Sequence, residues 1–276
     1  MRTDVAPEPV KGDLELRGVG KTYASGAGNE FEALGNIDLR IGSGEFVSLI
    51  GPSGCGKSTL LRLIADIIQP TTGSIGVLGR SAREARLARG YGMVFQQPTL
   101  LDWRTVRKNV ELPLQIIGID REERQHRATE LLQLVKLSDF EDRYPWHLSG
   151  GMQQRVAIAR ALAFNPPVLL MDEPFGALDE MTREHMQTEV LRIWERLRPT
   201  VVFVTHSIPE AAFLSQRAVV MASNPGRIFK QIPIDMPYPR GPETREAPEY
   251  YRALTSIREA LRLGGAVATA GDPLLN

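Results

Sequence analysis

A glycine-rich octapeptide near the start of the chain constrains its fold more than any other feature. Residues 51–58 read Gly-Pro-Ser-Gly-Cys-Gly-Lys-Ser and satisfy the phosphate-loop pattern G-x-x-x-x-G-K-[ST]. An apolar strand is predicted before this loop, over 45–50, and a helix after it, over 59–67. Because the pattern binds phosphate when it joins a strand to a helix, this context predicts an α/β nucleotide-binding core.

The residue types in this loop suit phosphate binding. Its glycines let the backbone curl so that successive amide groups point at phosphate oxygens, and the following helix adds its positive N-terminal end. Lys57 is predicted to reach the β- and γ-phosphates, and the Ser58 hydroxyl to hold Mg²⁺. Cys55 is interpreted as a small loop filler, although a helix N-terminus can lower a thiol pKa. The predicted nucleotide contacts here are Gly51, Pro52, Ser53, Gly54, Cys55, Gly56, Lys57, Ser58 and Thr59.

Two further apolar runs continue the α/β pattern. Residues 168–172 and 200–205 are short and strongly apolar, and a loop and a helix candidate follow each of them. Such strands are typical of a largely buried parallel sheet, which binds ligands at the carboxyl ends of its strands. Alternation of apolar and polar residues over 13–17 and 37–41 predicts half-exposed antiparallel strands, so we expect a mixed sheet with an antiparallel edge.

The middle of the chain changes character. Strand signals vanish between residues 96 and 164, and helical periodicity runs over 106–117, 121–135 and 150–164. We therefore predict a helical subdomain inserted into an α/β domain that spans residues 13–235.

Both ends of the chain are predicted to lie outside this domain. Residues 1–12 form an N-terminal tail without the apolar stretch of a signal peptide. Residues 236–276 begin with a linker rich in proline, glycine and charge. An amphipathic helix follows, which we expect to cap the protein's own core before a tail of small residues; its apolar stripe is predicted to contain Tyr251, Leu254, Ile257 and Leu261.

Two acidic residues stand at the end of the strand predicted over 168–172. Asp172 can hold Mg²⁺ opposite Ser58, because both residues lie at the carboxyl edge of neighbouring buried strands. Glu173 points elsewhere and is free to accept a proton from an attacking water. An Asp-Glu pair often just begins a solvated loop, so this interpretation depends on its pairing with the phosphate loop.

A second anion-binding helix start is predicted within residues 148–155, which read Leu-Ser-Gly-Gly-Met-Gln-Gln-Arg. Ser149 is a natural N-cap, and Gly150 and Gly151 leave the backbone bare for close approach by a ligand. Generic nucleotide-binding folds have no need of such a second site.

Through these segments the chain resembles the ATP-binding-cassette (ABC) family, over almost all of residues 13–235. Residues 148–155 look like the family's signature motif, residues 51–59 like its Walker A loop, and residues 168–173 like its Walker B strand with the adjoining catalytic glutamate. The remaining matches are Tyr23 to the aromatic that stacks on adenine, Gln96 to the Q-loop glutamine, Asp179 to the D-loop aspartate and His206 to the switch histidine.

The resemblance implies an ATPase that works as a head-to-tail dimer. The site that holds ATP on the phosphate loop of one subunit is then completed by Ser149, Gly150 and Gly151 of a second copy. Its cofactors are ATP and Mg²⁺, and Gln96 is expected to contact both Mg²⁺ and the helical subdomain. The catalytic residues expected on this basis are Glu173 as general base, His206 at the γ-phosphate, and Lys57.

Details of the sequence, including Trp103 and residues 172–179 and 225–228, are similar to ATPase subunits of nitrate, sulfonate and taurine importers and their pyrimidine-precursor relatives. Asp102 and Asp66 depart from residues frequent in that group. The resemblance implies a transmembrane permease as partner, a solute-binding protein as indirect partner, and a peripheral location at the cytoplasmic face of the membrane. The transported solute is not predicted.

The segment over residues 97–114 follows the Q-loop and is expected to expose Leu, Trp and Val side chains. In transporters of this family the region receives the coupling helix of the permease. The alternative is a locally packed edge of the helical subdomain.

Composition bears on the rival function, a soluble ABC ATPase that acts on nucleic acid or ribosomes without a membrane partner. The 276 residues include 33 Lys and Arg against 33 Asp and Glu, so no overall charge draws the chain to nucleic acid. The strongest basic run, over 80–89, is interrupted by Glu84 and is interpreted as a solvated helix face. The single cysteine fits a reducing compartment, and no apolar run approaches the roughly 20 residues of a membrane span.

Overall fold

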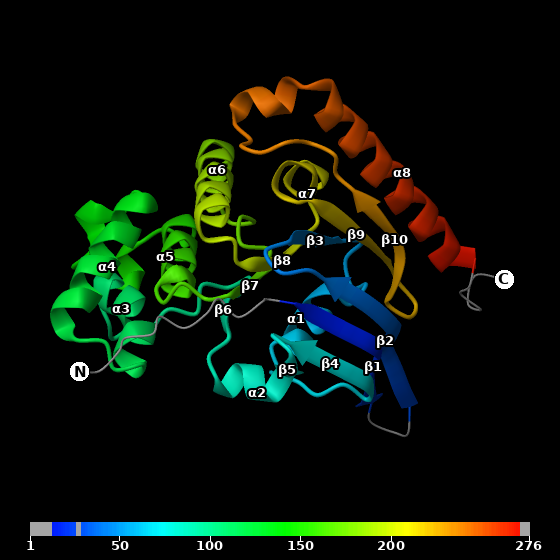
Figure 1. The fold of residues 1–276 in the computed structure, drawn as a ribbon, viewed down its shortest axis with the longest axis horizontal. Coiled ribbons are helices and arrows are strands. Elements are labelled where there is room, and N and C mark those ends of the chain that lie inside the picture. Colours follow the sequence, from blue (N-terminus) through cyan, green and yellow to red (C-terminus); the bar gives the residue numbers. More distant parts are fainter. Residues whose placement is uncertain (1–12, 26–28, 271–276) are drawn as a thin grey trace, which may run out of the picture.

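The computed structural model describes residues 13–25 and 29–270, which form two sheets with helices around them (Figure 1). The larger sheet has the strand order β10-β9-β3-β8-β7-β6. All its neighbouring pairs are parallel except β10 with β9, so the predicted mixed sheet is confirmed. Its strands are β3 (Phe46–Ile50), β6 (Tyr91–Val94), β7 (Val168–Asp172), β8 (Thr200–Thr205), β9 (Arg217–Ala222) and β10 (Arg227–Pro233).

The early strands form a separate antiparallel sheet. It contains, in order, β2 (Asn29–Ile41), β1 (Leu14–Ser25), β4 (Thr72–Val77) and β5 (Arg80–Ser81). The predicted antiparallel strands pair as expected, with Leu14 opposite Ile41. Because β1 bonds β2 on one edge and β4 on the other, it has no edge left for the larger sheet. The antiparallel edge of that sheet is instead β10.

Helix α1 (Lys57–Ile64) lies between the two sheets and contacts strands of both. Its buried Leu60 and Ile64 share an apolar cluster with Leu14 of β1 and Val47 of β3. On the opposite face of the larger sheet, α6 (Glu180–Leu197) and α7 (Ile208–Leu214) belong to a second cluster. This layering places the start of α1, and hence the phosphate loop, where the two sheets meet.

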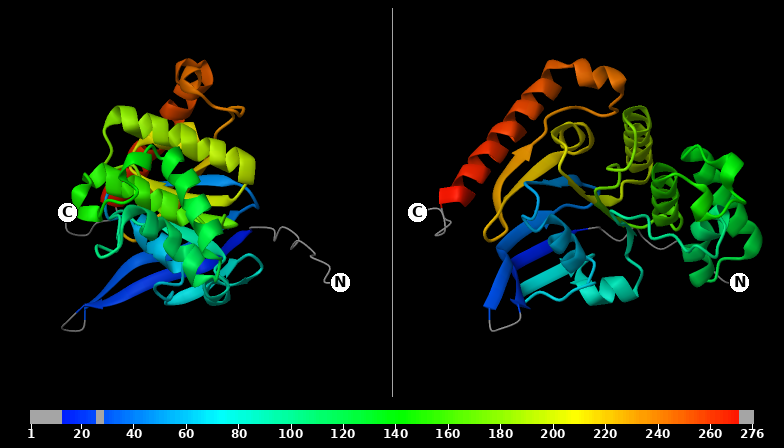
Figure 2. Two further views of the ribbon diagram at one scale, coloured as in Figure 1. Left: turned by 90° about the vertical axis from the view of Figure 1, so that its left-hand side faces the viewer. Right: turned by 180° about the vertical axis from the view of Figure 1, so that it is seen from behind.

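Three helices form a group at one end of the molecule: α3 (Val106–Ile116), α4 (Arg121–Leu134) and α5 (Gly150–Leu162) (Figures 1 and 2). They contact one another, and their starts match the predicted ones. Each begins at a side-chain N-cap, which is Thr105, Asp120 or Ser149. Their apolar cluster continues into the larger sheet.

The segment over 97–114 is only partly exposed. Trp103 is 74% exposed, but Val106, Val110 and Leu114 are buried. The expectation of exposed Val side chains is therefore wrong, because the apolar stripe of α3 packs against α4 and α5. The basic run over 80–89 contains α2 (Ala82–Leu87), whose Arg83 and Arg86 are exposed as expected.

The predicted C-terminal helix is α8 (Pro248–Ala270), which runs along α7, β9 and β10 (Figure 1). Ile257 is buried as expected, whereas Tyr251 is 57% exposed and Tyr250 is buried in its place. The predicted stripe is thus wrong at its first position: small side chains, Ala253 and Ala260, share the buried face and shift it toward Tyr250.

The segment before α8 is packed rather than a bare linker. Arg240 is 3% exposed, and its guanidinium donates hydrogen bonds to the carbonyl oxygens of Ala212, Phe213, Ser215 and Met236. Within the described residues, no helix has the length and apolar character needed to cross a bilayer. The predicted N-terminal tail over 1–12 and the last residues of the predicted small-residue tail, 271–276, lie outside the described residues.

Candidate functional site

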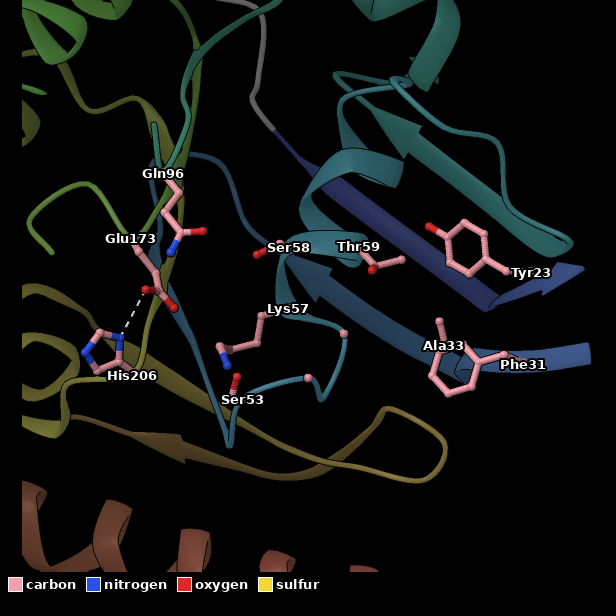
Figure 3. Close-up of a pocket in the computed structure, with 12 residues that line it drawn as sticks. Tyr23, Phe31, Ala33, Ser53, Lys57, Ser58, Thr59, Gln96, Glu173 and His206 are labelled. Carbon is pink, nitrogen blue, oxygen red and sulfur yellow. Dashed lines mark hydrogen bonds and ion pairs between the residues drawn. The ribbon is translucent and has the colours of Figure 1, made fainter. Parts of the chain in front are cut away.

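A pocket of about 390 Å³ opens where the phosphate loop, the carboxyl ends of β7 and β8, and strands β1 and β2 meet (Figure 3). Both sheets therefore contribute to it. Ten predicted site residues line this pocket, together with two that were not predicted. They are Tyr23, Ser53, Gly54, Gly56, Lys57, Ser58, Thr59, Gln96, Glu173 and His206, joined by Phe31 and Ala33.

The phosphate loop owes its shape to glycine. Gly54 and Gly56 have φ values of 77° and 91°, in the left-handed region that other residues adopt only with strain. Gly51 lies so close to β9 that an added Cβ would stand 2.7 Å from the carbonyl oxygen of Met221. These positions leave an open turn of backbone directly before α1, as a phosphate cradle requires.

Lys57 is held over this loop. Its Nζ donates hydrogen bonds to the carbonyl oxygens of Gly51 at 2.8 Å and Pro52 at 2.9 Å, and the residue is 7% exposed. The ammonium group has three donors, so this arrangement fixes a cation beside the backbone cradle.

The Cys55 side chain is buried within the phosphate loop, next to Gly51. The residue is 1% exposed, and burial raises the pKa of its thiol above the usual value despite the nearby Lys57 ammonium. A buried thiol in its protonated form is a poor nucleophile, which agrees with the interpretation of Cys55 as a loop filler.

Ser58 and Asp172 bring two oxygen ligands together. The Ser58 hydroxyl donates to Asp172 Oδ1 at 2.8 Å. Asp172 is 2% exposed at the end of β7, and burial raises the pKa of its carboxyl. A buried carboxyl beside a hydroxyl provides the oxygen donors that Mg²⁺ prefers, and a bound cation would compensate the burial of its charge.

Glu173 and His206 are in contact with each other on one side of the pocket. His206 Nδ1 lies 3.1 Å from Glu173 Oε2, and both residues line the pocket on the same side of Lys57 (Figure 3). His206 directly follows β8, as Glu173 follows β7, and these strands are parallel neighbours. The two side chains can therefore act on one atom placed between them and the phosphate loop.

Gln96 enters the pocket from the segment after β6 (Figure 3). The preceding residue is anchored to α5, because Gln154 of that helix donates from Nε2 to the carbonyl oxygen of Phe95 at 3.0 Å. Gln154 is 1% exposed. This contact joins the segment that carries Gln96 to the helix that Ser149 caps.

The far end of the pocket is aromatic. Tyr23 of β1 and Phe31 of β2 are paired in register, and Ala33 lies two residues further along β2. Tyr23 was predicted to stack on adenine, whereas Phe31 and Ala33 were missed. The sequence carries no local signal that pairs Phe31 with Tyr23, so both missed residues emerge only from the pairing of β1 with β2.

Eight predicted residues do not line the pocket. Gly51, Pro52, Cys55 and Asp172 lie directly beside it in the phosphate loop and at the end of β7, whereas the other four belong to the starts of α5 and α6. None of its lining, as far as the structure describes the chain, comes from Ser149, Gly150, Gly151 or Asp179. Ser149 caps α5 and Gly150 has open space around it, so the start of this helix is open at these two residues, whereas Gly151 packs against Ala177 and Leu178. Asp179 caps α6, where the backbone N–H of Thr182 lowers the pKa of its carboxyl.

Comparisons with known proteins place the chain in a family. A family model described as ABC transporter matches residues 34–176. The chain is 49% identical to an uncharacterized ABC transporter ATP-binding protein of Methanocaldococcus jannaschii, over 83% of this chain and 85% of that protein. It is 44% identical to the nitrate import ATP-binding protein NrtD of Synechocystis sp., over 90% and 95%. With the taurine import ATP-binding protein TauB of Rhizobium johnstonii, the identity is 47%, over 77% and 80%.

A solved structure has the same fold. It is a dimeric post-hydrolysis state of an ATP-binding cassette bound to ADP and Pi, which matches with a TM-score of 0.75 and 39% identity. The match covers 81% of this chain and 99% of that one. Sequence, fold and pocket thus agree, and the chain belongs to the ABC transporter family and is an ATPase of that family.

Proposed function

We propose that the pocket hydrolyses ATP with Glu173 as the general base. The observation that carries this proposal is the meeting of three groups in one pocket: the Lys57 ammonium on its glycine loop, and the Glu173 carboxylate 3.1 Å from His206. Adenine lies against Tyr23 and Phe31, and the phosphates reach the loop. A water attacks the γ-phosphorus, Glu173 takes its proton, and the bond from that phosphorus to the bridging oxygen breaks.

The remaining groups position the reacting atoms and neutralise the charge of the phosphates. Lys57 and the backbone amides of the loop bind the β- and γ-phosphate oxygens. His206 contacts the γ-phosphate and keeps Glu173 oriented. Ser58, Asp172 and Gln96 would hold Mg²⁺, which when bound would neutralise charge on the β- and γ-phosphates.

The site is completed by a second copy of the chain, in this proposal. The start of α5, with Ser149, Gly150 and Gly151, lies outside its own pocket, is open at Gly150, and offers backbone amides to an anion. The cassette with the same fold is dimeric, which supports the pairing of two copies. In the proposed pairing the copies are arranged head to tail, and these residues meet the γ-phosphate on the partner. Asp179 then lies near the dimer contact.

The ATPase drives solute uptake through a separate permease at the cytoplasmic face of the membrane. Support comes from the nitrate and taurine import relatives and from the exposed Trp103 after the Q-loop. Nitrate, sulfonate, taurine and pyrimidine precursors are the solute classes proposed, with a solute-binding protein as the indirect partner. Residues 96–164 act as the helical subdomain that meets the permease.

Glu173→Gln is expected to bind ATP yet lose turnover by roughly 10²–10⁴-fold, the usual contribution of general base catalysis. The amide keeps the shape and the contact with His206 but cannot take a proton. Steady-state phosphate release and the Kd of a fluorescent ATP analogue measure the two effects. Wild-type turnover in this variant would refute the role of Glu173.

The partner is tested by isolating the tagged full chain from detergent-solubilised membranes of its host. We expect co-purification of a permease, identified by mass spectrometry, and a loss of that permease with Trp103→Ala. A tagged chain that recovers ribosomes or DNA, and no membrane protein, would favour the soluble rival.

A further inference from the structure

The turn that carries His206 is linked by hydrogen bonds to a buried carboxylate that lies outside the pocket. Glu210 lies in the first turn of α7 and is 6% exposed. Its Oε2 accepts a hydrogen bond from the Thr205 hydroxyl at 2.5 Å. Thr205 Oγ1 in turn accepts one from the backbone N–H of Ser207 at 2.9 Å. Because His206 lies between these two residues, Glu210 closes the turn that presents the imidazole to the pocket.

The same carboxylate faces the loop that follows Glu173. Glu210 Oε1 lies 3.9 Å from Nε of Arg183, in the first turn of α6. The Arg183 guanidinium donates to the carbonyl oxygens of Leu178 at 2.9 Å and Phe175 at 3.4 Å. Those carbonyls belong to the loop between Glu173 and Asp179. Arg183 therefore holds this loop while it faces Glu210.

Glu210 is thus linked to both loops that carry the proposed catalytic side chains, to one through Thr205 and to the other through Arg183. On the pocket side, His206 and Glu173 are 3.1 Å apart, and on the core side their loops meet at Glu210 and Arg183. Burial raises the pKa of the Glu210 carboxyl, while the Thr205 hydroxyl and Arg183 oppose this shift. A carboxyl is costly to bury unless polar partners surround it. Here one partner, Thr205, directly precedes His206, and the other, Arg183, binds the loop that follows Glu173.

We propose that Glu210 is a positioning residue for ATP hydrolysis, which holds His206 through Thr205 and the loop after Glu173 through Arg183. Glu210 does not line the pocket. The inference rests on the proposed roles of Glu173 and His206, and it predicts an effect on turnover rather than on nucleotide binding.

The experiment measures kcat, KM for MgATP, nucleotide Kd and Tm for the full chain. Glu210→Ala is expected to lower kcat about 10²-fold, the typical effect of a misplaced catalytic group, with KM and Kd unchanged within about threefold. Glu210→Gln keeps an acceptor for the Thr205 hydroxyl and is expected to restore most of the lost kcat. Glu111→Gln, which alters another buried carboxylate in α3, is the matched control and should keep wild-type kcat.

A double-mutant cycle separates positioning from a general loss of structure. Thr205→Val removes only the hydroxyl that joins Glu210 to the turn. If both residues act as one unit, the double variant Thr205→Val, Glu210→Ala loses about as much kcat as Glu210→Ala alone. Losses that multiply in the double variant would overturn the proposal. So would an unchanged kcat in Glu210→Ala, or an equal loss in the Glu111→Gln control.

Failure of this inference differs from failure of the proposed function. The wild-type chain and Glu173→Gln are measured alongside the other variants. Absent wild-type hydrolysis, or full turnover in Glu173→Gln, would remove the proposed function itself. If those two chains behave as expected while Glu210→Ala keeps wild-type kcat, only the positioning role is wrong.

Discussion

At the scale of single residues, one backbone turn separates the roles of Asp172, the last residue of β7, and Glu173, which follows it. Glu173 has a φ of 45°, in the left-handed region that costs a non-glycine residue about 1 kcal/mol. Its backbone N–H donates to the carbonyl oxygen of Val204 at 3.0 Å, which fixes the turn. Asp172 therefore stays buried beside Ser58, while Glu173 faces the pocket. The sequence predicted that these acids point apart, but nothing in its letters indicates the left-handed turn responsible.

Asp172→Asn is expected to raise the Tm of the nucleotide-free chain and to abolish Mg²⁺-dependent hydrolysis. Burial raises the pKa of Asp172, so the folded state binds more protons than the unfolded state just above the usual Asp pKa. The wild-type chain therefore loses stability as pH rises from that value through the raised pKa. The neutral amide still accepts from Ser58 and avoids this loss.

The measurement is Tm between about pH 4, close to the usual Asp pKa, and about pH 8, above neutral pH. The advantage of Asp172→Asn should be smallest at the acidic end and largest at the neutral end. Ser58→Ala is the matched control, since it removes the hydroxyl without removing the charge. A lower Tm for Asp172→Asn at neutral pH would contradict the expectation.

At the scale of elements, the sequence located helices more reliably than the faces they bury. The strand over 168–172 and the start of α5 at Gly150 agree with the structure, because an apolar run and an N-cap mark them locally. The buried face of α8 was misplaced at its first position, since the spacing of large apolar residues gives no weight to Ala253 and Ala260. Small residues at a close helix contact carry no such periodic signal.

Ile257→Ala in α8 is expected to lower the free energy of unfolding by about 2–5 kcal/mol, the usual cost of such a core truncation. Ile257 is fully buried against the core that contains α7. Leu263→Ala, in the same helix but at a residue 47% exposed, should change this free energy by at most about 0.5 kcal/mol. Urea unfolding followed by circular dichroism measures both. Equal effects of the two variants would show that α8 does not pack as described.

At the scale of the whole molecule, the sequence predicted the α/β class and the main site residues, but not how the sheets divide. Strand pairing joins distant residues, such as Leu14 with Val77, and no local pattern encodes it. The pocket lies across that division, with Tyr23 on the antiparallel sheet and Lys57 following a strand of the mixed one. Phe31 was missed for this reason: its place in the site depends on its pairing with β1.

Glu173→Gln with saturating MgATP is expected to sediment as a dimer, because uncleaved nucleotide holds two copies together in the proposed arrangement. With ADP the same chain should be monomeric. Adding Ser149→Arg should abolish the dimer, since the larger side chain obstructs the open start of α5. Sedimentation velocity distinguishes these states. A chain that stays monomeric with MgATP, even when its permease is present, would remove the head-to-tail model.

The separation of Ser149 from its own pocket has a consequence for mixtures of damaged subunits. In the proposed dimer, a chain with Ser149→Arg keeps an intact phosphate loop and Glu173, and a chain with Glu173→Gln keeps an intact helix start. Either preparation alone contains no complete site. When the two inactive preparations are combined, each mixed pair regains one undamaged site, so complementation in trans should restore hydrolysis.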